Sequence, residues 1–396
     1  MLAITLRDEA MQWRGQIYAT KVQAVLKPNT PDTFVVDVAP DSLEMMARLR
    51  PGWGLIIRDG DTVISGDITE LRQTAKDHGI TYEISGVGDL HHLADRITYP
   101  DPVHSEAEQS TATWKGEGPA ETVIKDLVSL NAGERALPER RVRGLIVETS
   151  AGRGEIVKTE VRLKSLLETA ANLAREGRLL MQTHPIRGGV RFTVEPVRDL
   201  SKRVRLTSIA GEVTGWELSD HVGTVNTVIV GGQGTGADRT LVARTRSDEW
   251  HRRIEIFKDR RDTDEAGALE KAAAEELDKG EAERTLKLTT FESVTRRLGE
   301  DFRVGDIISV QLTNQGTVVK LPVAEAKITW ENYARSVELT LGGLEKPVTC
   351  SWIECAANST NSPPSKENSC LKLLKLASQE RTHRSPSRNG LLSPMV

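Results

Sequence analysis

The chain has 396 residues, of which 38% are apolar and 28% charged, a composition typical of a soluble globular protein with two or three domains. Aromatic residues make up only 4%, which favours several small modules with aliphatic cores over one large core. The net charge of −4 excludes a general electrostatic attraction to nucleic acid or acidic lipid.

The N-terminal segment predicts neither secretion nor membrane insertion. Arg7 and Asp8 interrupt its apolar residues before a secretory signal can form. No apolar run along the chain reaches the roughly 18 residues that a membrane-spanning helix needs. We therefore expect a protein that is made in a cytosol and carries no membrane anchor of its own.

Residues 1–102 predict a first module of the β-barrel type. Asp59-Gly60-Asp61 is a strong hairpin-turn signal, and we assign both aspartates to turn chemistry. Asp41, with Glu44 three residues later, predicts a capping box on a short helix that ends near Pro51. Apolar or alternating runs predict strands at residues 33–38, 55–57, 62–64, 68–71 and 81–85.

Residues 103–200 predict a small α+β domain. Its first part, residues 103–118, is polar and indicates a loop or linker. Gly177 stands where the second of two helices should end, as a C-terminal cap. The elements expected from apolar periodicity are helices at residues 119–131 and 164–176, followed by hairpin strands at 179–182 and 190–195 around a turn at 185–189.

Residues 201–344 predict a second β-barrel module that a helical insertion interrupts at about residues 260–284. Within the insertion, an Ala/Glu-rich helix is expected from a cap at Asp262 to a stop at Gly280. Strands are expected at residues 226–230 and 240–243, and again after the insertion up to Gly343.

Residues 345–396 differ in kind, because Ser, Asn and Pro cluster there with little periodicity. They predict a flexible tail, and the abrupt change of composition is also compatible with an altered reading frame. The only cysteines, Cys350, Cys355 and Cys370, lie in this tail without CxxC spacing. We therefore expect no disulfide in the main fold and no zinc site.

Two stretches share one layout of glycine, hairpin and strands. In the first, Arg50-Pro51-Gly52 precedes a series of strands that ends at Gly86. In the second, Arg303-Val304-Gly305 precedes a similar series that ends at Gly342. Any two β-meanders have this outline, but a duplication would give two related modules in one chain. Three such chains would place six similar modules in a ring, which can dock on a six-fold tube.

Three clusters are candidates for chemistry, and each has a structural alternative that we favour. Gly231–Gly236 follows a strand, but a phosphate-binding loop needs a helix after its glycines, and residues 237–242 predict another strand. His91-His92 has the composition of a metal site, but adjacent side chains point in different directions on regular elements, so we favour a surface or domain-edge role. The segment 252–262 interleaves acids with bases and indicates a salt-bridged strand edge or a subunit contact.

The sequence contains no GxSxG or HExxH motif, and residues 1–349 contain no cysteine. We therefore predict that the chain is not an enzyme, and we assign it no catalytic, cofactor-binding or metal-binding residues and no cofactor.

The order of four segments resembles the minor tail proteins of long-tailed (siphovirus) phages of Gram-positive bacteria, of the tail-tip or baseplate hub type. The resemblance spans roughly residues 1–345. The segments that carry it are Leu49–Gly52 with its hairpin, Asp95-Arg96 before Tyr99–Pro102, Val225–Gly234, and Arg253–Arg261.

This resemblance implies an α+β, β-rich fold with two related tube-like β-barrel modules and an α+β domain between them. It implies a homotrimeric ring in the virion, at the tail tip, assembled in the host cytoplasm. The ring would adapt the six-fold tail tube to a three-fold tip and line the channel for the tape-measure protein and DNA. Its partners would be the tail-tube or distal tail protein, the tape-measure protein and other tail-tip or fibre proteins, with DNA only in transit.

Three alternatives stay open. A tail-borne peptidoglycan hydrolase would need clustered carboxylates or a Cys/His or metal site. A host-receptor-binding module would need an exposed groove lined by aromatic residues, which are few and scattered here. A hub of a contractile injection machine would share the fold of a phage tail hub.

Overall fold

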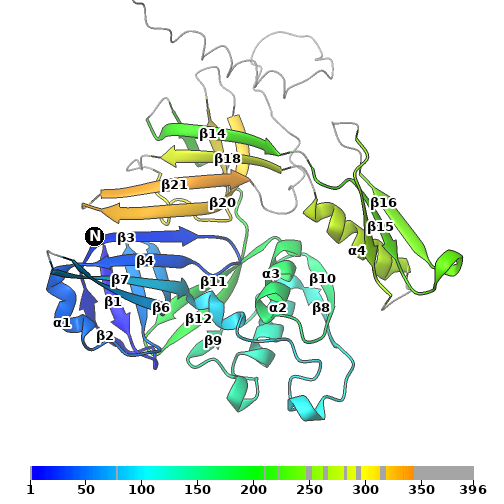
Figure 1. Ribbon diagram of the computed structural model, residues 1–396, viewed down its shortest axis with the longest axis horizontal. Helices are drawn as coiled ribbons and strands as arrows, with labels where there is room; N and C mark the ends of the chain where they lie inside the picture. The colour runs from blue at the N-terminus through cyan, green and yellow to red at the C-terminus, as the bar shows by residue number, and fades with distance from the viewer. Residues whose placement is uncertain are drawn as a thin grey trace, which may run out of the picture. The chain divides into compact units, whose positions relative to one another are not determined.

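The computed structural model describes residues 2–76, 79–208, 211–221, 223–246, 252–261, 266–280, 283–290, 296–312, 318–332 and 334–342. Within them the chain is a β-rich α+β protein, as predicted (Figure 1). Every helix among these residues is too short or too polar to span a bilayer. The predicted tail at residues 345–396 and the predicted helix cap at Asp262 lie outside the described residues.

The largest element of the fold is a sheet that runs through both β-rich parts of the chain and has thirteen strands among the described residues. We call its N-terminal strands the first module and its C-terminal strands the second module. The first module consists of β1 (Ala3–Arg7), β2 (Trp13–Ile17), β3 (Ala19–Leu26), β4 (Thr33–Val38), β5 (Gly54–Asp59), β6 (Thr62–Lys76) and β7 (Gly79–Gly88). The second module consists of β13 (Arg205–Thr207), β14 (Val213–His221), β18 (Glu283–Thr290), β19 (Ile307–Gln311), β20 (Val318–Glu331) and β21 (Ala334–Gly342).

The two modules repeat one strand topology. In the first, β3 pairs with β4, β4 with β7, β7 with β6, and β6 with β5. In the second, β14 pairs with β18, β18 with β21, β21 with β20, and β20 with β19. The layout that the sequence suggested is therefore present in the hydrogen-bond pattern of the described strands.

The irregularities of the two modules repeat as well. A register shift interrupts β6–β7 between Ile68 and Glu70, and another interrupts β20–β21 between Val323 and Glu325. A second pair of shifts lies at the start of β3–β4 and of β14–β18. Chance resemblance of two β-meanders would not reproduce bulges at matching positions, because a bulge is a specific local feature.

One expectation about these strands was wrong. Residues 62–64 and 68–71 are not separate strands but parts of the single strand β6, which bends at its bulge. In the second module, β20 likewise continues as one strand through its bulge. A bulge leaves one residue unpaired and disturbs the alternation of apolar residues, so the sequence pattern shows an apparent break where the strand continues.

The two modules join through the antiparallel pairing of β3 with β20 (Figure 1). Their buried apolar residues form one continuous core that draws on both halves of the chain, from Ile4 to Leu341. The pairing of the described strands runs as an open series from β14 to β2, and no pairing closes either module on itself. The structure thus shows two related β-rich modules in one extended sheet.

The α+β part follows the first module and has its own apolar core. Its elements are β8 (Trp114–Pro119), α2 (Ala120–Asn131), β9 (Leu145–Val147), β10 (Ile156–Val161), α3 (Leu166–Glu176), β11 (Leu179–Ile186) and β12 (Gly189–Pro196). The two predicted helices and the predicted hairpin are confirmed. The predicted linker at residues 103–118 is wrong in its last part, because β8 lies there and pairs with β10.

Gly177 is the C-cap of α3, as predicted, but for a different physical reason. Its φ of −78° is right-handed, and the left-handed residue is the following Arg178, with a φ of 55°. A β-carbon on Gly177 would lie 2.2 Å from the β-carbon of Ala120. Glycine is therefore required because α3 ends against the start of α2, rather than for a left-handed turn.

The predicted capping box near Asp41 is wrong. A short 3₁₀ turn (Pro40–Ser42) comes first, and α1 (Leu43–Met46) begins after Ser42 without a side-chain cap. Glu44 instead forms an exposed ion pair of 2.9 Å with Arg48, one turn along the chain.

A third, smaller core lies under a separate sheet. The strands β15 (Thr227–Gly231), β16 (Leu241–Thr245) and β17 (Glu255–Asp259) pair in the order β16-β15-β17. Helix α4 (Ala266–Lys279) contacts this sheet through Leu269, Ala273 and Leu277. The segment that departs from the repeated topology is thus broader than the predicted insertion at residues 260–284.

Hydrogen bonds tie the hairpin β11–β12 to both modules. From the first module, Asn29 donates to the carbonyl of Leu179 at 3.1 Å and accepts from the N–H of Met181 at 2.7 Å. From the second module, Arg303 donates to Gln182 at 2.9 Å and also pairs with Glu195. The hairpin therefore bridges two parts of the sheet that lie far apart in the sequence.

The buried carboxylate of Glu121 stabilises the start of α2. Glu121 is fully buried and accepts from Lys125 Nζ at 2.7 Å and Arg153 Nε at 2.9 Å. Burial by itself raises the pKa of this carboxyl, but these bonds and the backbone N–H groups of Arg153 and Ala151 outweigh it and lower the pKa to about 2.

We expect Glu121→Gln to lower the free energy of unfolding by about 3–5 kcal/mol, because Lys125 and Arg153 lose a buried partner. The depressed folded pKa also means that this carboxylate contributes stability above its unfolded pKa of 4.5, on the order of 3 kcal/mol, which is lost as the pH falls toward 2. Urea titrations between pH 7 and pH 3 measure both effects. Glu117→Gln, at an exposed ion pair on β8, is the control and should change stability by less than about 1 kcal/mol.

Candidate functional site

The first candidate site is the junction between the two modules, where the pairing of β3 with β20 joins them into one sheet. Six residues of β20, from Ala326 to Glu331, pair with β3 from Leu26 back to Lys21. Ion pairs flank this ladder, with Lys21 Nζ 3.6 Å from Glu331 and Lys27 Nζ 3.0 Å from Glu325.

Asp59, at the end of β5, is the polar centre of this junction. Its carboxylate accepts from the Trp330 indole N–H at 2.8 Å and from Arg297 Nη2 at 2.9 Å, and Arg335 Nε lies 3.5 Å away. All three partners belong to the second half of the chain. Burial raises the pKa of Asp59, but Trp330 and the two guanidinium groups outweigh it and hold the pKa below its usual value.

The sequence assignment of Asp59 to turn chemistry was therefore wrong. The turn does form, and Gly60 has the left-handed φ of 59° that it requires. Asp61 is exposed, as a turn aspartate should be, but Asp59 is buried at 6% exposure. No local signal distinguishes the two residues, because the partners of Asp59 are more than 230 positions away.

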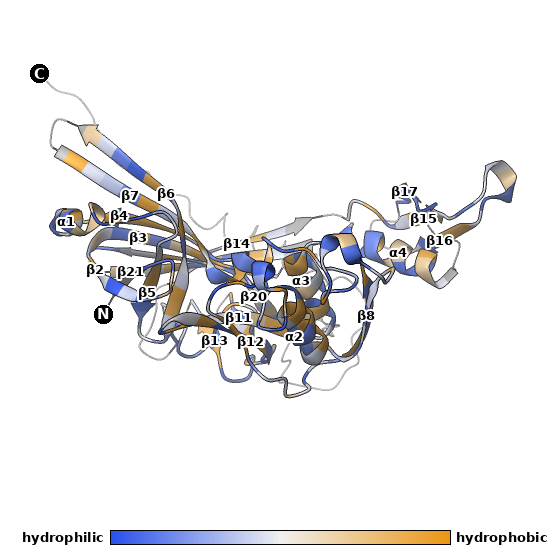
Figure 2. Cartoon of the chain, turned by 90° about the horizontal axis from the view of Figure 1, so that it is seen from below, coloured by the Kyte–Doolittle hydropathy of each residue, from blue (hydrophilic) through white to orange (hydrophobic). Residues whose placement is uncertain are grey.

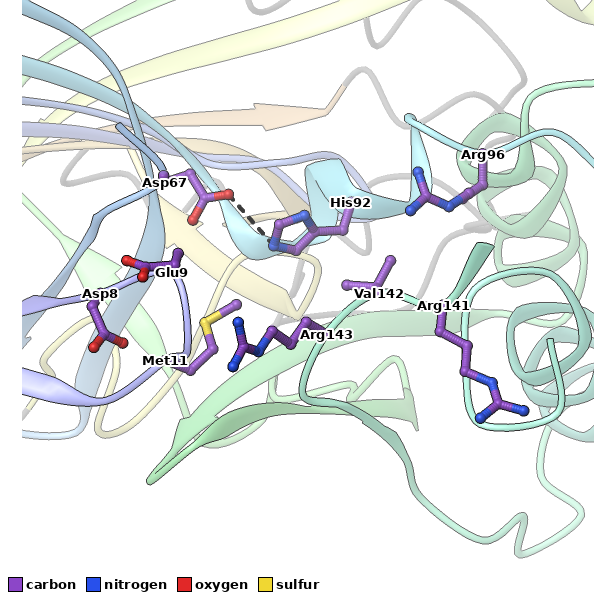
Figure 3. Close-up of a pocket in the computed structure, with 10 residues that line it drawn as sticks. Asp8, Glu9, Met11, Asp67, His92, Arg96, Arg141, Val142 and Arg143 are labelled. Atoms are coloured by element: carbon purple, nitrogen blue, oxygen red, sulfur yellow. Dashed lines mark ion pairs between the residues drawn. The ribbon is translucent and has the colours of Figure 1, made fainter. Parts of the chain in front are cut away.

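The second candidate site is a cluster of charged and imidazole groups where the first module meets the α+β part. The guanidinium of Arg7 is buried and bonds to Asp67 Oδ1 at 2.8 Å and to buried Asp89. Asp67 comes from β6, and Asp89 begins a 3₁₀ helix, η2 (Asp89–Leu93), which follows β7. One pocket of about 180 Å³ adjoins this cluster, with Asp67 and His92 in its wall (Figure 3).

His91 and His92, both on η2, face the same carboxylate. Their Nε2 atoms lie 3.4 Å and 3.6 Å from Asp67 Oδ2, and their ring centroids are 4.1 Å apart. Figure 3 shows the His92 ring directed at Asp67. Burial lowers the pKa of His92, and the adjacent His91 lowers it further.

The expectation that adjacent histidines point in different directions is wrong here. It holds for an α-helix or a strand, but a short 3₁₀ turn together with two rotatable side chains lets both rings converge. The group Asp67, His91 and His92 is the set that can hold a metal ion among the described residues. Sequence reasoning did not pair them with Asp67, because the pairing depends on how β6 and β7 are aligned.

The other predicted candidates have structural roles. Gly231 ends β15 and Gly236 begins a three-residue 3₁₀ turn, and together they bound the loop that leads to the antiparallel strand β16, so the inter-strand loop is confirmed. The charged segment at residues 252–261 contains β17, an edge strand of its sheet. Ion pairs of 2.5 Å link Arg253 to Glu255 and Arg239 to Asp259, so the salt-bridged strand edge is confirmed.

Asp59→Asn tests the junction. We expect it to lower the free energy of unfolding by about 3 kcal/mol, because the buried Asp59 side chain loses its charge while Arg297 and Arg335 each lose one charged partner. Since the folded pKa of Asp59 lies below 3.8, its contribution is present above that pH and is lost as the pH falls through the folded pKa. The control is Asp61→Asn in the same turn, which should shift stability by less than about 0.5 kcal/mol. Equal losses in the two variants, measured by urea titration, would contradict this role.

Comparison with solved structures finds the same fold in tail proteins. The chain matches the 43 kDa tail protein of prophage MuSo2 from Shewanella oneidensis at a TM-score of 0.53 and 13% identity, covering 86% of this chain and 98% of that one. It matches the tail protein from Neisseria meningitidis MC58 at a TM-score of 0.54 and 13% identity, covering 86% and 96%. At these identities the likeness shows the fold alone. None of the curated protein sequences compared with the chain matches it.

A comparison with protein-family models gives the family. The model of the Siphovirus ReqiPepy6 Gp37-like protein matches residues 3–343, which include both modules, the α+β part and the small sheet with α4. The resemblance to tail proteins of long-tailed phages over roughly residues 1–345 is confirmed by this match. The chain therefore belongs to the Siphovirus Gp37-like family of phage tail proteins.

Proposed function

We propose that this phage tail protein is a hub subunit that forms a homotrimeric ring at the tail tip, without enzymatic activity. Residues 1–102 and 201–344 would act as two quasi-equivalent tube-like barrels, completed by contacts with neighbouring copies. Six such modules would match a six-fold tail tube, while the chain itself repeats three times. The observation that carries this proposal is the junction between the two modules. Each module has the two kinds of strand edge that form this junction, but the chain pairs only one edge of each kind with itself.

The junction within the chain uses two strand edges, one on β3 and one on the outer part of β20. By the repeat, β14 is the counterpart of β3, and β6 is the counterpart of β20. Beyond Asp67, β6 has no partner other than β7 among the described strands. Likewise, β14 is the terminal strand of the sheet. Among the described strands, each chain thus offers one unpaired edge of each type.

The repeated bulges fix which residues correspond. Val323 and Ile68 stand at the same point before the bulge, so residues 326–331 of β20 correspond to residues 71–76 of β6. The bulge at the start of β14 makes Trp216 the counterpart of Val22, and Leu218 the counterpart of Ala24. Copying the β3–β20 register then places Gln73 opposite Leu218 and Ala75 opposite Trp216 of the next chain.

Exposure of apolar residues at these two edges supports the pairing. Val22 and Ala326 lie in the junction within the chain, and both are fully buried. Their counterparts at the unpaired edges, Trp216 and Leu71, are large and expose 38% and 42% of their surface. The outer part of the β6–β7 hairpin carries apolar as well as polar residues (Figure 2). Exposed apolar strand edges invite pairing with another chain.

The two edges also carry opposite charges. Arg72 lies on the outer part of β6, and Glu217 lies on β14. Ion pairs flank the junction within the chain in the same manner. A head-to-tail contact of this kind closes into a ring at three copies if every junction turns the chain by one sixth of a circle. Three junctions would then lie within chains and three between them.

The tail-tube or distal tail protein, the tape-measure protein and other tip or fibre proteins are the proposed partners of the ring. A lumen lined by inward-facing strands would give DNA a passage without sequence-specific contacts. The proposed absence of enzymatic activity is tested by applying the purified chain to a zymogram of host cell walls. A clear zone in the gel would contradict it and favour the hydrolase alternative.

We expect the full chain to form a trimer and the double variant Leu71→Asp/Trp216→Asp to be a folded monomer. The two new carboxylates would lie at the proposed interface, where Glu217 already carries negative charge, so pairing is disfavoured. Light scattering coupled to size-exclusion chromatography measures the mass, and particle imaging shows whether the trimer is an open ring. Ile156→Asp, at a 71% exposed apolar residue of β10, is the matched control and should remain a trimer.

Two outcomes would count against this interface. A wild-type chain that stays monomeric at high concentration and with tail-tube protein would overturn the ring. A double variant that assembles as well as the Ile156→Asp control would leave the ring but exclude the β6–β14 contact.

A further inference from the structure

We propose that Asp67, His91 and His92 bind one divalent transition-metal ion of the zinc class, with a water molecule as the fourth ligand. The proposal is independent of the trimeric ring, because all three side chains come from one chain. It differs from the sequence prediction that the chain has no metal-binding residues.

The spacing of the three ligand atoms fits a tetrahedral ion. Zinc binds imidazole nitrogen and carboxylate oxygen at about 2.0–2.2 Å, so two ligands of a tetrahedron lie about 3.4 Å apart. Asp67 Oδ2 lies 3.4 Å from His91 Nε2 and 3.6 Å from His92 Nε2. All three atoms lie within 4.8 Å of one another. An ion would therefore need only small rotations of the two rings.

A contact with the backbone orients the His91 ring. Its Nδ1 lies 3.1 Å from the carbonyl oxygen of Gly88, which accepts a hydrogen bond when Nδ1 carries the proton. The lone pair is then on Nε2, the atom that faces Asp67. Histidines that bind metals commonly donate their other N–H to a backbone carbonyl in this way.

His92 provides a second, independent indication. Its Nε2 is buried and has no hydrogen-bond partner, although Asp67 lies close by. A buried polar atom without a partner costs free energy, and most such atoms in proteins are satisfied by a group or a bound ion. A metal ion between His92 and Asp67 would satisfy this nitrogen.

The groups that bond directly to the cluster carry a net negative charge, whereas the adjoining pocket is lined by both acids and arginines. Arg7 occupies Asp67 Oδ1 and leaves Oδ2 facing the histidines. Asp89 offsets the charge of Arg7, and its own Oδ2 is buried without a hydrogen-bond partner. Arg7, Asp67 and Asp89 together have a net charge of about −1 when both imidazoles are neutral. The adjoining pocket, whose wall contains Asp67 and His92, gives a water molecule access to the fourth position.

Such an ion would link β6 to η2, where the first module passes into the α+β part. The competing explanation is a pair of imidazoles that only share an ion pair with Asp67. A metal site predicts that the protein binds one metal ion per chain. Ion-paired imidazoles predict no such binding, because a protonated imidazole cannot bind a metal ion.

The test uses the full chain with Cys350, Cys355 and Cys370 replaced by serine, because thiolates in the tail would also bind the probe. Cobalt(II) is titrated in as the only added metal, and its visible absorption and binding heat are followed. We expect one equivalent per chain with the intense visible bands of a tetrahedral Co²⁺ site, and a higher Tm in the presence of the metal. Zinc(II) should displace the cobalt and abolish the bands.

His91→Gln and His92→Gln should each weaken cobalt binding by at least about 10-fold and abolish the Tm increase. The matched control is His104→Gln, because His104 also pairs with a carboxylate, that of Asp101 at 2.9 Å, but has no second histidine beside it. Circular dichroism verifies that each variant is folded before titration. Absence of stoichiometric binding to the parent chain would overturn the proposal, and so would undiminished binding in folded His91→Gln and His92→Gln variants.

Discussion

The pairing of β3 with β20 is the constraint on which the rest of the structure depends. It makes one sheet out of strands from both halves of the chain, and it allows their apolar side chains to form one core. Backbone hydrogen bonds alone would not select this partner, since every strand edge offers the same groups. Specificity comes from Asp59, whose buried carboxylate interacts with Arg297, Trp330 and Arg335 of the second half of the chain.

The repeated topology gives this junction a wider meaning. A module with a β3-type edge and a β20-type edge can be joined to another module at either side, and the chain uses only one pair of edges internally. The remaining edges, on β14 and β6, carry exposed Trp216 and Leu71 where their counterparts are buried. The proposed ring therefore needs no new kind of contact, only a second use of the contact that already holds the chain together.

The sequence predicted what depends on local patterns and missed what depends on distant partners. Apolar periodicity located α2, α3, β4 and the hairpin β11–β12, and the paired glycines Gly52 and Gly305 revealed the repeat. The sequence did not reveal that β6 continues through its bulge, or that Asp59 is buried. Adjacent side chains point in different directions on an α-helix or a strand, so the sequence pattern argues against His91 and His92 as joint ligands. The position of η2 beside β6 brings both rings to Asp67.

The distance along the chain between β3 and β20 also bears on how the protein is made. Leu26 and Ala326 are partners in the sheet although 300 positions separate them. At a synthesis rate of 5–20 residues per second, the edge of β3 waits roughly 15–60 s on the ribosome before its partner emerges. Lys21 and Lys27 border that edge, and lysines of this kind discourage wrong pairing with other nascent chains. The two lysines that form ion pairs across the finished junction therefore also disfavour pairing of the β3 edge with other chains during translation.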